Sequence, residues 1–387
     1  MKIAVLGCGT AGVVSVCHWL NYGLRIEVNC IYDKDIKTLG IGESTNVHLP
    51  NDLFLGGGFS MLENSNELDA TIKYGVKYTN WNDKNFYSHI VPPNYGIHFN
   101  NFKLKEIIFP KLKDKKFKEV IGHIDSVETK DNLVYIKINN KIYRYDYVID
   151  CRGTPTDYKD YVISDVLPLN HALVHTINKP GDWNYTKHIA TENGWMFGIP
   201  LQTRQNYGYM FNDKITSVKE AKQDLKKIFN TELNLKEFKF KPYRTKVFLK
   251  NRILKNGNKA VFFEPLEALS GVMYDQINRL MWDHVYSNKS ENWLNEQATL
   301  MSKKCENFIA FIYNESSNFK TPFWKTTRKK TKKHLTNKYW IETLEFIATS
   351  IKQNNLYNIG NNFVCYPFIP WLWKKYFKHF NINHENT

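Results

Sequence analysis

Apolar and polar positions at the start of the chain predict a strand, a helix and a second strand. Residues 2–7 form an apolar run that ends in glycine, which is typical of a buried strand. Residues 11–22 place apolar side chains at helical spacing, and residues 25–32 form the next apolar run. A βαβ unit of about thirty residues therefore opens the chain.

Strand patterns dominate the first two thirds of the chain, and helical patterns dominate the last third. We expect two short strands within residues 130–150. Bulky and small residues alternate over 195–211, which predicts a hairpin. Ser217 and Glu220 have the spacing of a capping box, which predicts a helix that ends near residue 230.

Apolar residues recur at helical spacing over residues 272–287 and again over 340–351, so two further helices are expected there. Between them lies the polar stretch 325–338, rich in lysine and threonine. It has no apolar periodicity, and we expect a mobile surface loop with its lysines in solvent.

Composition limits the class of protein. A chain of 387 residues forms one large or two ordinary domains, and 42% hydrophobic residues exclude a wholly disordered protein. No apolar run approaches the length of a membrane span, so no membrane partner is expected. The six cysteines are scattered without a CxxC pair, which predicts neither a zinc framework nor disulfides and fits a reducing cytoplasm. His48, His123 and His171 lack partners at metal spacing, so no metal site is expected.

The charge is strongly positive, with 53 Lys and Arg against 38 Asp and Glu. Such a field attracts nucleic acid, acidic partners or a charged cofactor, but compositional drift explains it equally well. The lysine run at 325–334 lacks the interleaved aromatic residues that stack on bases, so no nucleic-acid partner is expected.

Residues 7–12 read Gly-Cys-Gly-Thr-Ala-Gly and fit the pattern GxGxxG between the first strand and the first helix. In that position the glycines allow a tight turn and the close approach of a pyrophosphate to the helix N-terminus. An acidic residue at the end of the second strand would bind the ribose. The residues expected to bind a dinucleotide are Gly7, Gly9, Thr10, Ala11, Gly12 and Asp33.

A second glycine-rich segment, Gly40-Ile-Gly-Glu-Ser-Thr, follows at residues 40–45. Its hydroxyl groups and backbone are suited to donate to a phosphate or a flavin ring, but by itself the segment is only a polar loop. The chain has one GxGxxG pattern, which fits bound FAD and leaves no second site for NAD(P)H.

Several segments together resemble the flavin-dependent halogenases of the tryptophan-halogenase type. They follow the order of that family from residue 3 to about residue 324. The matching segments are GCGTAG at 7–12, GIGEST at 40–45, DATIKYGVKY at 69–78, IDCRG at 149–153, GWMFGIPL at 194–201, GYMF at 208–211, GNKAVFFEPLE at 257–267 and TPFW at 321–324.

The resemblance implies an α/β fold. It consists of an FAD-binding Rossmann-like region with an additional antiparallel sheet over residues 1–271 and a mainly helical substrate-capping region over 272–387. It also implies an FADH2-dependent halogenase that receives reduced FAD from a separate flavin reductase and uses O2 and a halide ion. The substrate would be a small electron-rich aromatic of the indole or phenol class, and a homo-oligomer is expected.

The resemblance also assigns roles to individual residues. Lys73 and Glu267 are the implied catalytic pair. The further cofactor ligands that it implies are Gly42, Glu43, Ser44, Thr45, Gly257 and Asn258. The halide would bind through backbone N–H groups, and a wall of side chains would separate flavin from substrate. The halide-binding residues would be Leu269, Ser270 and Gly271, and the wall would contain Trp195, Phe197, Ile199 and Pro200.

A lysine amine is chemically suited to receive hypohalous acid, either through a hydrogen bond or as a haloamine. The second route needs the neutral amine, so burial would have to lower the pKa of Lys73. A buried pair with Glu267 would oppose that shift and keep both groups charged, and both routes stay open. Glu267 itself would accept the substrate proton or orient the oxidant.

Two other functions remain open. Phe197 replaces the second tryptophan of the family's wall, which keeps a flavin-dependent aromatic hydroxylase as an alternative. A non-enzymatic alternative is a basic flavin- or nucleic-acid-binding protein derived from such an enzyme. A set of aromatic residues in the last third of the chain would either line an open ring-binding pocket, for which free tryptophan is not the best substrate, or form a core. These residues are Phe308, Phe311, Tyr313, Phe323, Trp324, Trp371 and Trp373.

Overall fold

The structure is a computed structural model. It describes residues 1–38, 43–82, 85–90, 94–315, 317–357, 367–368 and 370–380. Gly42, one of the predicted cofactor ligands, lies outside these ranges.

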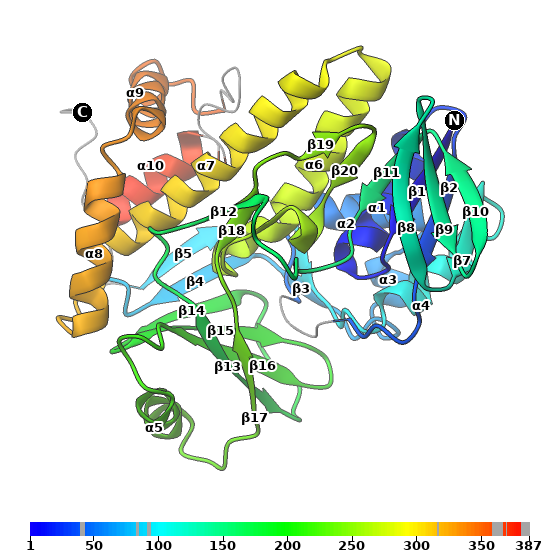
Figure 1. Cartoon of the computed structure of the whole chain (residues 1–387). Helices are drawn as coiled ribbons and strands as arrows, with labels where there is room; N and C mark the ends of the chain where they lie inside the picture. The colour runs from blue at the N-terminus through cyan, green and yellow to red at the C-terminus, as the bar shows by residue number, and fades with distance from the viewer. Residues whose placement is uncertain are drawn as a thin grey trace.

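The predicted βαβ unit belongs to a six-stranded sheet, which is parallel except for one edge strand (Figure 1). Helix α1 (Thr10–Tyr22) connects its first two strands. The strands are, in spatial order, β19 (Leu249–Lys250), β20 (Ile253–Lys255), β11 (Tyr147–Asp150), β1 (Lys2–Leu6), β2 (Glu27–Tyr32) and β7 (Phe117–Ile121).

A three-stranded antiparallel sheet packs on the six-stranded sheet through a small apolar cluster that includes Ala4, Ile31 and Ile136. Residues 130–150 contain three complete strands, at 133–138, 141–145 and 147–150, where we predicted two. Asn139 and Asn140 both have positive φ, which is the geometry of a tight two-residue hairpin turn, and this turn divides the segment. The strands are β8 (Ile124–Lys130), β9 (Leu133–Ile138) and β10 (Lys141–Tyr145), and β11 follows in the larger sheet.

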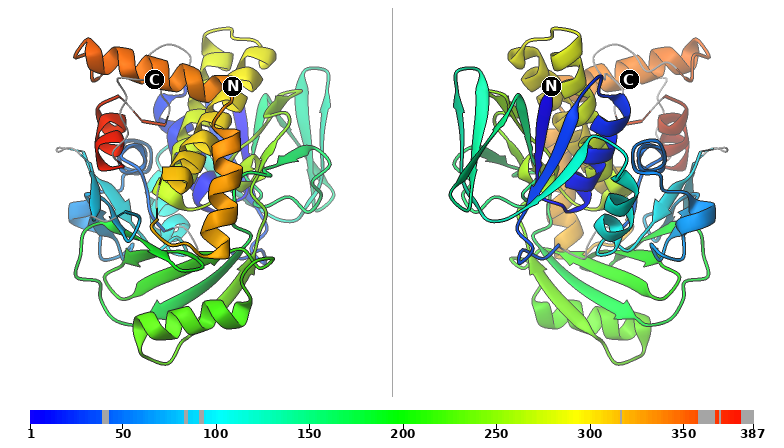
Figure 2. Two further views of the ribbon diagram at one scale, coloured as in Figure 1. Left: turned by 90° about the vertical axis from the view of Figure 1, so that its left-hand side faces the viewer. Right: turned by 90° about the vertical axis from the view of Figure 1, so that its right-hand side faces the viewer.

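A seven-stranded mixed sheet forms the second half of the core. Helix α5 (Val218–Phe229) covers one of its faces (Figure 2), and the predicted capping box of Ser217 and Glu220 starts this helix. The predicted hairpin is confirmed as β15 and β16. In spatial order the strands are β17 (Leu235–Lys239), β13 (His171–Ile177), β16 (Gln205–Phe211), β15 (Gly194–Pro200), β14 (Thr186–Thr191), β4 (Gly75–Thr79) and β5 (Phe86–His89).

Smaller elements connect the two large sheets. Two short sheets pair β3 with β6, and β12 with β18 and β21. Their bounds, with those of the remaining early helices, are β3 (Thr71–Lys73), β6 (Gly96–His98), β12 (Tyr161–Ile163), β18 (Tyr243–Thr245), β21 (Val261–Phe262), α2 (His48–Gly57), α3 (Met61–Asn64) and α4 (Leu104–Ile108).

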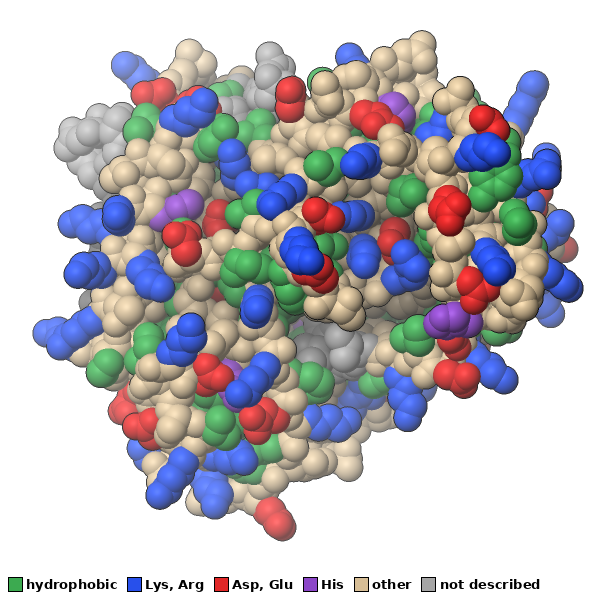
Figure 3. All heavy atoms as spheres, viewed as in Figure 1, with side chains coloured by type: hydrophobic (Ala, Val, Ile, Leu, Met, Phe, Trp, Pro, Cys, Tyr) green, Lys and Arg blue, Asp and Glu red, His purple; other side chains and the backbone are tan. Residues whose placement is uncertain are grey.

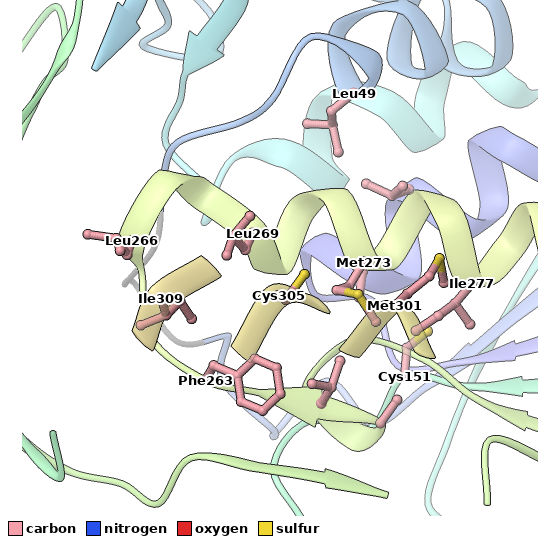
Figure 4. Close-up of a cluster of buried hydrophobic side chains, with 14 of the residues drawn as sticks. Leu49, Cys151, Phe263, Leu266, Leu269, Met273, Ile277, Met301, Cys305 and Ile309 are labelled. Carbon is pink, nitrogen blue, oxygen red and sulfur yellow. The ribbon is translucent and has the colours of Figure 1, made fainter. Parts of the chain in front are cut away.

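Helices dominate the last third of the chain, as predicted. Figure 4 shows α6 between α2 and α7, with apolar side chains of all three helices in one cluster. The division predicted at residue 271 falls within the first turn of α6, and it stays a prediction. The helices are α6 (Leu269–Tyr286), α7 (Glu291–Glu315), α8 (Pro322–His334), α9 (Lys338–Lys352) and α10 (Pro370–His379).

The surface loop predicted at residues 325–338 is wrong, because most of this stretch belongs to helix α8. Thr327 and Thr331 lie one turn apart and are buried, while the lysines between them face solvent. On the buried side of this part of α8 the sequence has threonine instead of apolar residues, so it lacks the apolar periodicity by which a helix is usually predicted. The prediction that the lysines are solvated is confirmed.

The aromatic residues of the helical region form core. Phe308, Phe311, Tyr313, Phe323 and Trp324 are each at most 2% exposed, and they belong to the largest apolar cluster of the molecule. This burial fits the interpretation of these residues as core, and a ring-binding pocket lined by them stays a prediction.

Lysine and arginine are spread over the face drawn in Figure 3 and alternate with acidic side chains. On this face they do not gather in one stripe of the kind that follows a nucleic-acid backbone. Within the part of the chain that the structure describes, no helix combines the length and the apolar character needed to cross a membrane.

Candidate functional site

The glycine-rich turn between β1 and α1 has the geometry of a phosphate cradle. Gly7 has φ +92°, and a Cβ on Gly12 would lie 2.0 Å from the Gly7 carbonyl oxygen, so both positions need glycine. A Cβ on Gly9 would meet nothing within 4 Å, which leaves open space in front of the turn. No side chain caps α1 and no acidic residue lies in its first turn, so its N–H groups can bind an anion such as the FAD pyrophosphate.

Asp33 lies directly after β2, at the edge of the sheet where the turn also lies. Its carboxylate accepts a hydrogen bond from the Asp35 backbone N–H at 3.0 Å and lies 3.3 Å from His123 Nδ1. These contacts keep the pKa of Asp33 below its ordinary value, the Asp35 bond having the larger effect. The position and charge suit a ribose ligand, and this role stays a prediction.

Gly257 and Asn258 pack against the same turn. Gly257 has φ +61°, and a Cβ there would lie 2.4 Å from the Ala11 Cβ, so the two backbones approach closely. The Asn258 side-chain oxygen accepts a hydrogen bond from the Tyr274 hydroxyl at 3.0 Å. The structure thus brings two predicted cofactor segments together that are far apart in sequence.

Glu43 lies within the second glycine-rich segment and is 1% exposed. Its carboxylate faces β16, where it accepts hydrogen bonds from Arg204 at 2.6 Å and Asn206 at 2.5 Å. Burial raises the pKa of Glu43 to about 7, although Arg204 opposes the shift. The contacts of this side chain are with protein, and its predicted role in cofactor binding remains untested.

Lys73 is the last residue of β3 and is 3% exposed. Its Nζ donates to Ser44 Oγ at 3.0 Å and to the Thr45 carbonyl at 2.9 Å. The segment predicted to face the flavin therefore holds the predicted catalytic amine. Burial lowers the pKa of Lys73 to about 8, and the charge of Glu267 opposes this shift.

Glu267 lies on a turn with an unusual backbone. Glu267 and the following Ala268 have φ of 54° and 55°, a left-handed conformation that is strained for residues other than glycine. The carboxylate accepts hydrogen bonds from the hydroxyl groups of Tyr78 at 2.8 Å and Tyr376 at 2.6 Å. Strained backbone of this kind is concentrated at functional sites, because packing around the site must maintain it.

We expected Lys73 and Glu267 to oppose the pKa shifts that burial causes and so to keep each other charged. They do oppose these shifts, but they do not cancel them. The two groups form no ion pair among those of the described residues, and each influences the other at longer range. Burial raises the pKa of Glu267 more than Lys73 lowers it, just as burial dominates at Lys73. Desolvation therefore has a larger effect than the pair's attraction on both groups.

A chain of buried polar groups continues from Ser44 away from the lysine. Ser44 Oγ lies 3.1 Å from Thr186 Oγ1, which lies 2.9 Å from His98 Nε2. Thr71 is the last member of this series of hydrogen-bonded groups. Its hydroxyl lies 3.2 Å from His98 Nδ1 and donates to the Pro200 carbonyl at 2.7 Å. Burial and the nearby lysine hold the pKa of His98 well below its ordinary value, so its imidazole is neutral.

The predicted wall residues all lie on β15. Trp195, Phe197 and Ile199 share one side of the strand and face the largest apolar cluster, with exposures of at most 3%. The Trp195 indole N–H donates to the Tyr313 hydroxyl at 2.8 Å. A Cβ on Gly208 would lie 2.2 Å from the Phe197 ring, so this ring needs glycine on the neighbouring strand. At the C-terminal end of the strand, the Pro200 carbonyl accepts the hydrogen bond of Thr71, two residues before Lys73.

Leu269, Ser270 and Gly271 are the first three residues of α6. Ala268 precedes them without a side-chain cap, and the first turn contains no acidic residue. The backbone N–H groups of this turn have no partner within the helix, and the positive end of the helix dipole favours an anion. The three residues predicted to bind halide therefore lie where an anion is stabilised, directly after Glu267.

Sequence reasoning missed four groups of this site, namely Tyr78, His98, Thr186 and Tyr376. Tyr78 lies within a matched segment, but the sequence alone predicts only a core residue for a tyrosine on a strand. His98, Thr186 and Tyr376 come from β6, β14 and α10, and no spacing along the chain connects them.

Comparison with known proteins identifies the family. The model of the family described as tryptophan halogenase matches residues 2–119 and 87–361. Tryptophan 7-halogenase RebH of Lentzea aerocolonigenes is 20% identical over 421 residues, which cover 85% of this chain and 79% of RebH. Tryptophan 6-halogenase ThaL of Streptomyces albogriseolus is 25% identical over 270 residues, which cover 61% and 49%.

Solved structures show the same fold. Tar14, a tryptophan C-6 flavin-dependent halogenase from taromycin biosynthesis, superposes with a TM-score of 0.80 at 17% identity, covering 97% of this chain and 89% of Tar14. BrvH, a flavin-dependent halogenase from Brevundimonas sp. BAL3, gives 0.79 at 16% identity, with coverage of 98% and 89%.

These matches confirm the predicted fold class, the FADH2-dependent halogenase class and the cofactor set of FAD, halide and O2, with a separate flavin reductase. They do not favour the hydroxylase or the binding protein. With matched segments that together span residues 2–361, the chain belongs to the tryptophan halogenase family.

Proposed function

We propose that this enzyme halogenates an electron-rich aromatic ring of the indole class, and that Lys73 delivers the oxidant while Glu267 accepts the proton that the ring loses. FAD supplied in reduced form, together with O2 and halide, provides hypohalous acid. The observation that carries the proposal is the buried Lys73 amine. It donates hydrogen bonds to Ser44 and Thr45 of the predicted flavin segment, and the charge of Glu267 acts on it.

The hydrogen bonds of Lys73 favour delivery through a hydrogen bond. Its ammonium form has three N–H donors, and Ser44 and Thr45 accept two of them. The third donor is available to hold the oxygen of hypohalous acid next to the substrate, where proximity makes the attack regioselective. The neutral amine would use both of its donors on the protein and offer a lone pair, which is the haloamine route.

These two routes differ in their pH dependence. Because the pKa of Lys73 is about 8, the third N–H is present below pH 8 and is lost above it. We expect the yield of halogenated product per reduced flavin oxidised to fall as pH rises through about 8. Product and flavin oxidation measured on both sides of this pH test the expectation, and a yield that rises through pH 8 would show delivery as a haloamine.

Glu267 is suited to accept the ring proton because two tyrosine hydroxyls fix its carboxylate. One of them, Tyr376, comes from α10, so the helical region predicted to cap the substrate contributes a hydroxyl to the site. This contact supports the proposed division into a cofactor-binding core over residues 1–271 and a capping region over 272–387. A homo-oligomer and a phenol substrate stay predictions.

The proposed function is tested by product analysis in a coupled assay. The pure protein, a flavin reductase, NADH and FAD are incubated with tryptophan, simple indoles and phenols, with chloride, bromide and iodide in separate reactions. We expect mass spectra to show halide-dependent product with at least one indole and no product without the reductase, because the chain has one dinucleotide motif. Oxygenated product that forms without halide would favour the hydroxylase instead.

A further inference from the structure

Three ligand-type side chains meet in the interior where α1, α2 and α6 pack together. They are His18, Asp52 and Asp275, one from each helix. One ligand atom of each lies within 4.8 Å of the others, and their exposures are 1%, 0% and 0%. The helices approach closely at this place, since a Cβ on Gly56 would lie 2.1 Å from the Cys17 carbonyl oxygen.

Most polar atoms of this cluster lack a well-formed hydrogen bond. Both ring nitrogens of His18, both carboxylate oxygens of Asp52 and Oδ1 of Asp275 are buried and have no partner at good hydrogen-bond geometry, although Asp275 and Tyr22 act on the Asp52 carboxyl group as hydrogen-bonding neighbours. Buried polar atoms are hydrogen-bonded in the large majority of cases, so five poorly paired atoms in one place require a cause. A ligand that accepts electron pairs from nitrogen and oxygen would satisfy all three side chains.

Asp275 is oriented as a ligand to such a group. Arg279, one turn further along α6, donates from Nε to Asp275 Oδ2 at 2.9 Å. This contact leaves Oδ1 directed into the cluster, 3.8 Å from His18 Nδ1. A carboxylate that binds a metal through one oxygen and an outer partner through the other is a usual arrangement in metal sites.

The charges of the cluster are compatible with a cation. Arg279 is the guanidinium beside the two carboxyl groups, and burial together with the charge of Asp275 raises the pKa of Asp52 to about 8, so a bound cation would displace the proton of Asp52. Among the described residues, further titratable groups at the cluster are His48 on α2, which interacts with Asp275, and Cys17 and Tyr22 on α1, which interact with Asp52.

We infer that His18, Asp52 and Asp275 bind one divalent transition-metal ion, of which Zn²⁺ is the best fit. Zinc accepts both imidazole nitrogen and carboxylate oxygen as ligands, and three protein ligands leave the fourth tetrahedral position to water. Mg²⁺ and Ca²⁺ prefer sites made of oxygen alone. The sequence predicted no metal site, because the three ligands lie on separate helices without any spacing pattern.

The ion would connect the helix that begins at the predicted phosphate cradle with the helix that begins at the predicted halide site. Helix α1 begins at the predicted phosphate cradle, and α6 begins at the predicted halide site. Both helices would be joined to α2 at a single point. The site is therefore structural, and its expected effect is on stability rather than on the halogenation step.

The test uses tag-free protein that has been stripped with a chelator and then titrated with Zn²⁺. We expect one equivalent of zinc per chain by elemental analysis and calorimetry, with release of protons on binding because the carboxylates compete with protons for the ion. At a free zinc concentration of about a hundred times Kd the Tm should rise by about 3 °C. A wild-type protein that binds less than half an equivalent and shows no shift in Tm would overturn the proposal.

Variants assign the binding to these residues. Asp52→Asn keeps the shape of a protonated aspartate, so it should fold, yet it should lose zinc binding and the zinc-dependent rise in Tm. His18→Gln should behave in the same way, and His123→Gln, at an exposed histidine, should retain one equivalent. If Asp52→Asn still binds one equivalent, a proton shared between the two carboxylates, not a metal, explains the cluster.

Discussion

Replacing Lys73 with alanine is expected to lower the rate of ring halogenation at least about a thousandfold, while reduced flavin is oxidised at the wild-type rate. The reason is the position of the amine. In the proposed function Lys73 acts on an oxidant that has already formed, held by its contacts with Ser44 and Thr45, so the variant would lose delivery alone. Product formation by mass spectrometry and flavin oxidation by absorbance are measured on the same sample.

Lys77→Ala is the matched control for this prediction. Lys77 lies four residues further on, on β4, where its ammonium lies 5.6 Å from the centre of the Tyr185 ring. We expect this variant to halogenate at close to the wild-type rate. Robust halogenation by the Lys73→Ala variant, with unchanged regioselectivity, would contradict the role of Lys73.

Glu267→Gln is expected to lower kcat about a hundredfold with little change in KM. The amide oxygen can still accept the hydrogen bonds of Tyr78 and Tyr376, so the packing of the turn is kept and only the proton-accepting carboxylate is lost. Steady-state rates in the presence of a flavin reductase measure the effect, and Tm confirms that the variant is folded.

Glu264 provides a control three residues earlier on the same segment. It is 1% exposed, and burial raises the pKa of its carboxyl group to about 8, so it is largely neutral at pH 7. Glu264→Gln therefore resembles the native form and should change kcat less than about twofold. Equal losses in both variants would point to a structural role for Glu267 in place of proton transfer.

The fold was predictable where one contiguous segment determines one element. The turn at residues 7–12, the hairpin of β15 and β16 and the capping box at Ser217 each contain their own signal. Helix α8 was not predictable by apolar periodicity, because its buried side consists largely of threonine after the first turn. The tight Asn139–Asn140 turn was a readable signal that the strand prediction overlooked.

The site was predictable to the extent that matched motifs carry it. Lys73 and Glu267 became candidates through resemblance alone, since a lysine in a strand and a glutamate after a proline have no special pattern. The groups that set their environment could not be predicted, because Tyr78, His98 and Tyr376 meet only in three dimensions. The direction of the pKa shifts also depends on burial, which no local pattern gives.

The tyrosine contacts of Glu267 also determine how late in folding the site can be completed. The hydroxyls of Tyr78 and Tyr376 come within 3.5 Å of each other although 298 positions separate them along the chain. During synthesis the cofactor-binding strands leave the ribosome long before α10 does. The carboxylate can gain its second hydroxyl only after that helix has emerged and docked, so loop closure over nearly the whole chain makes completion of the site one of the last steps of folding.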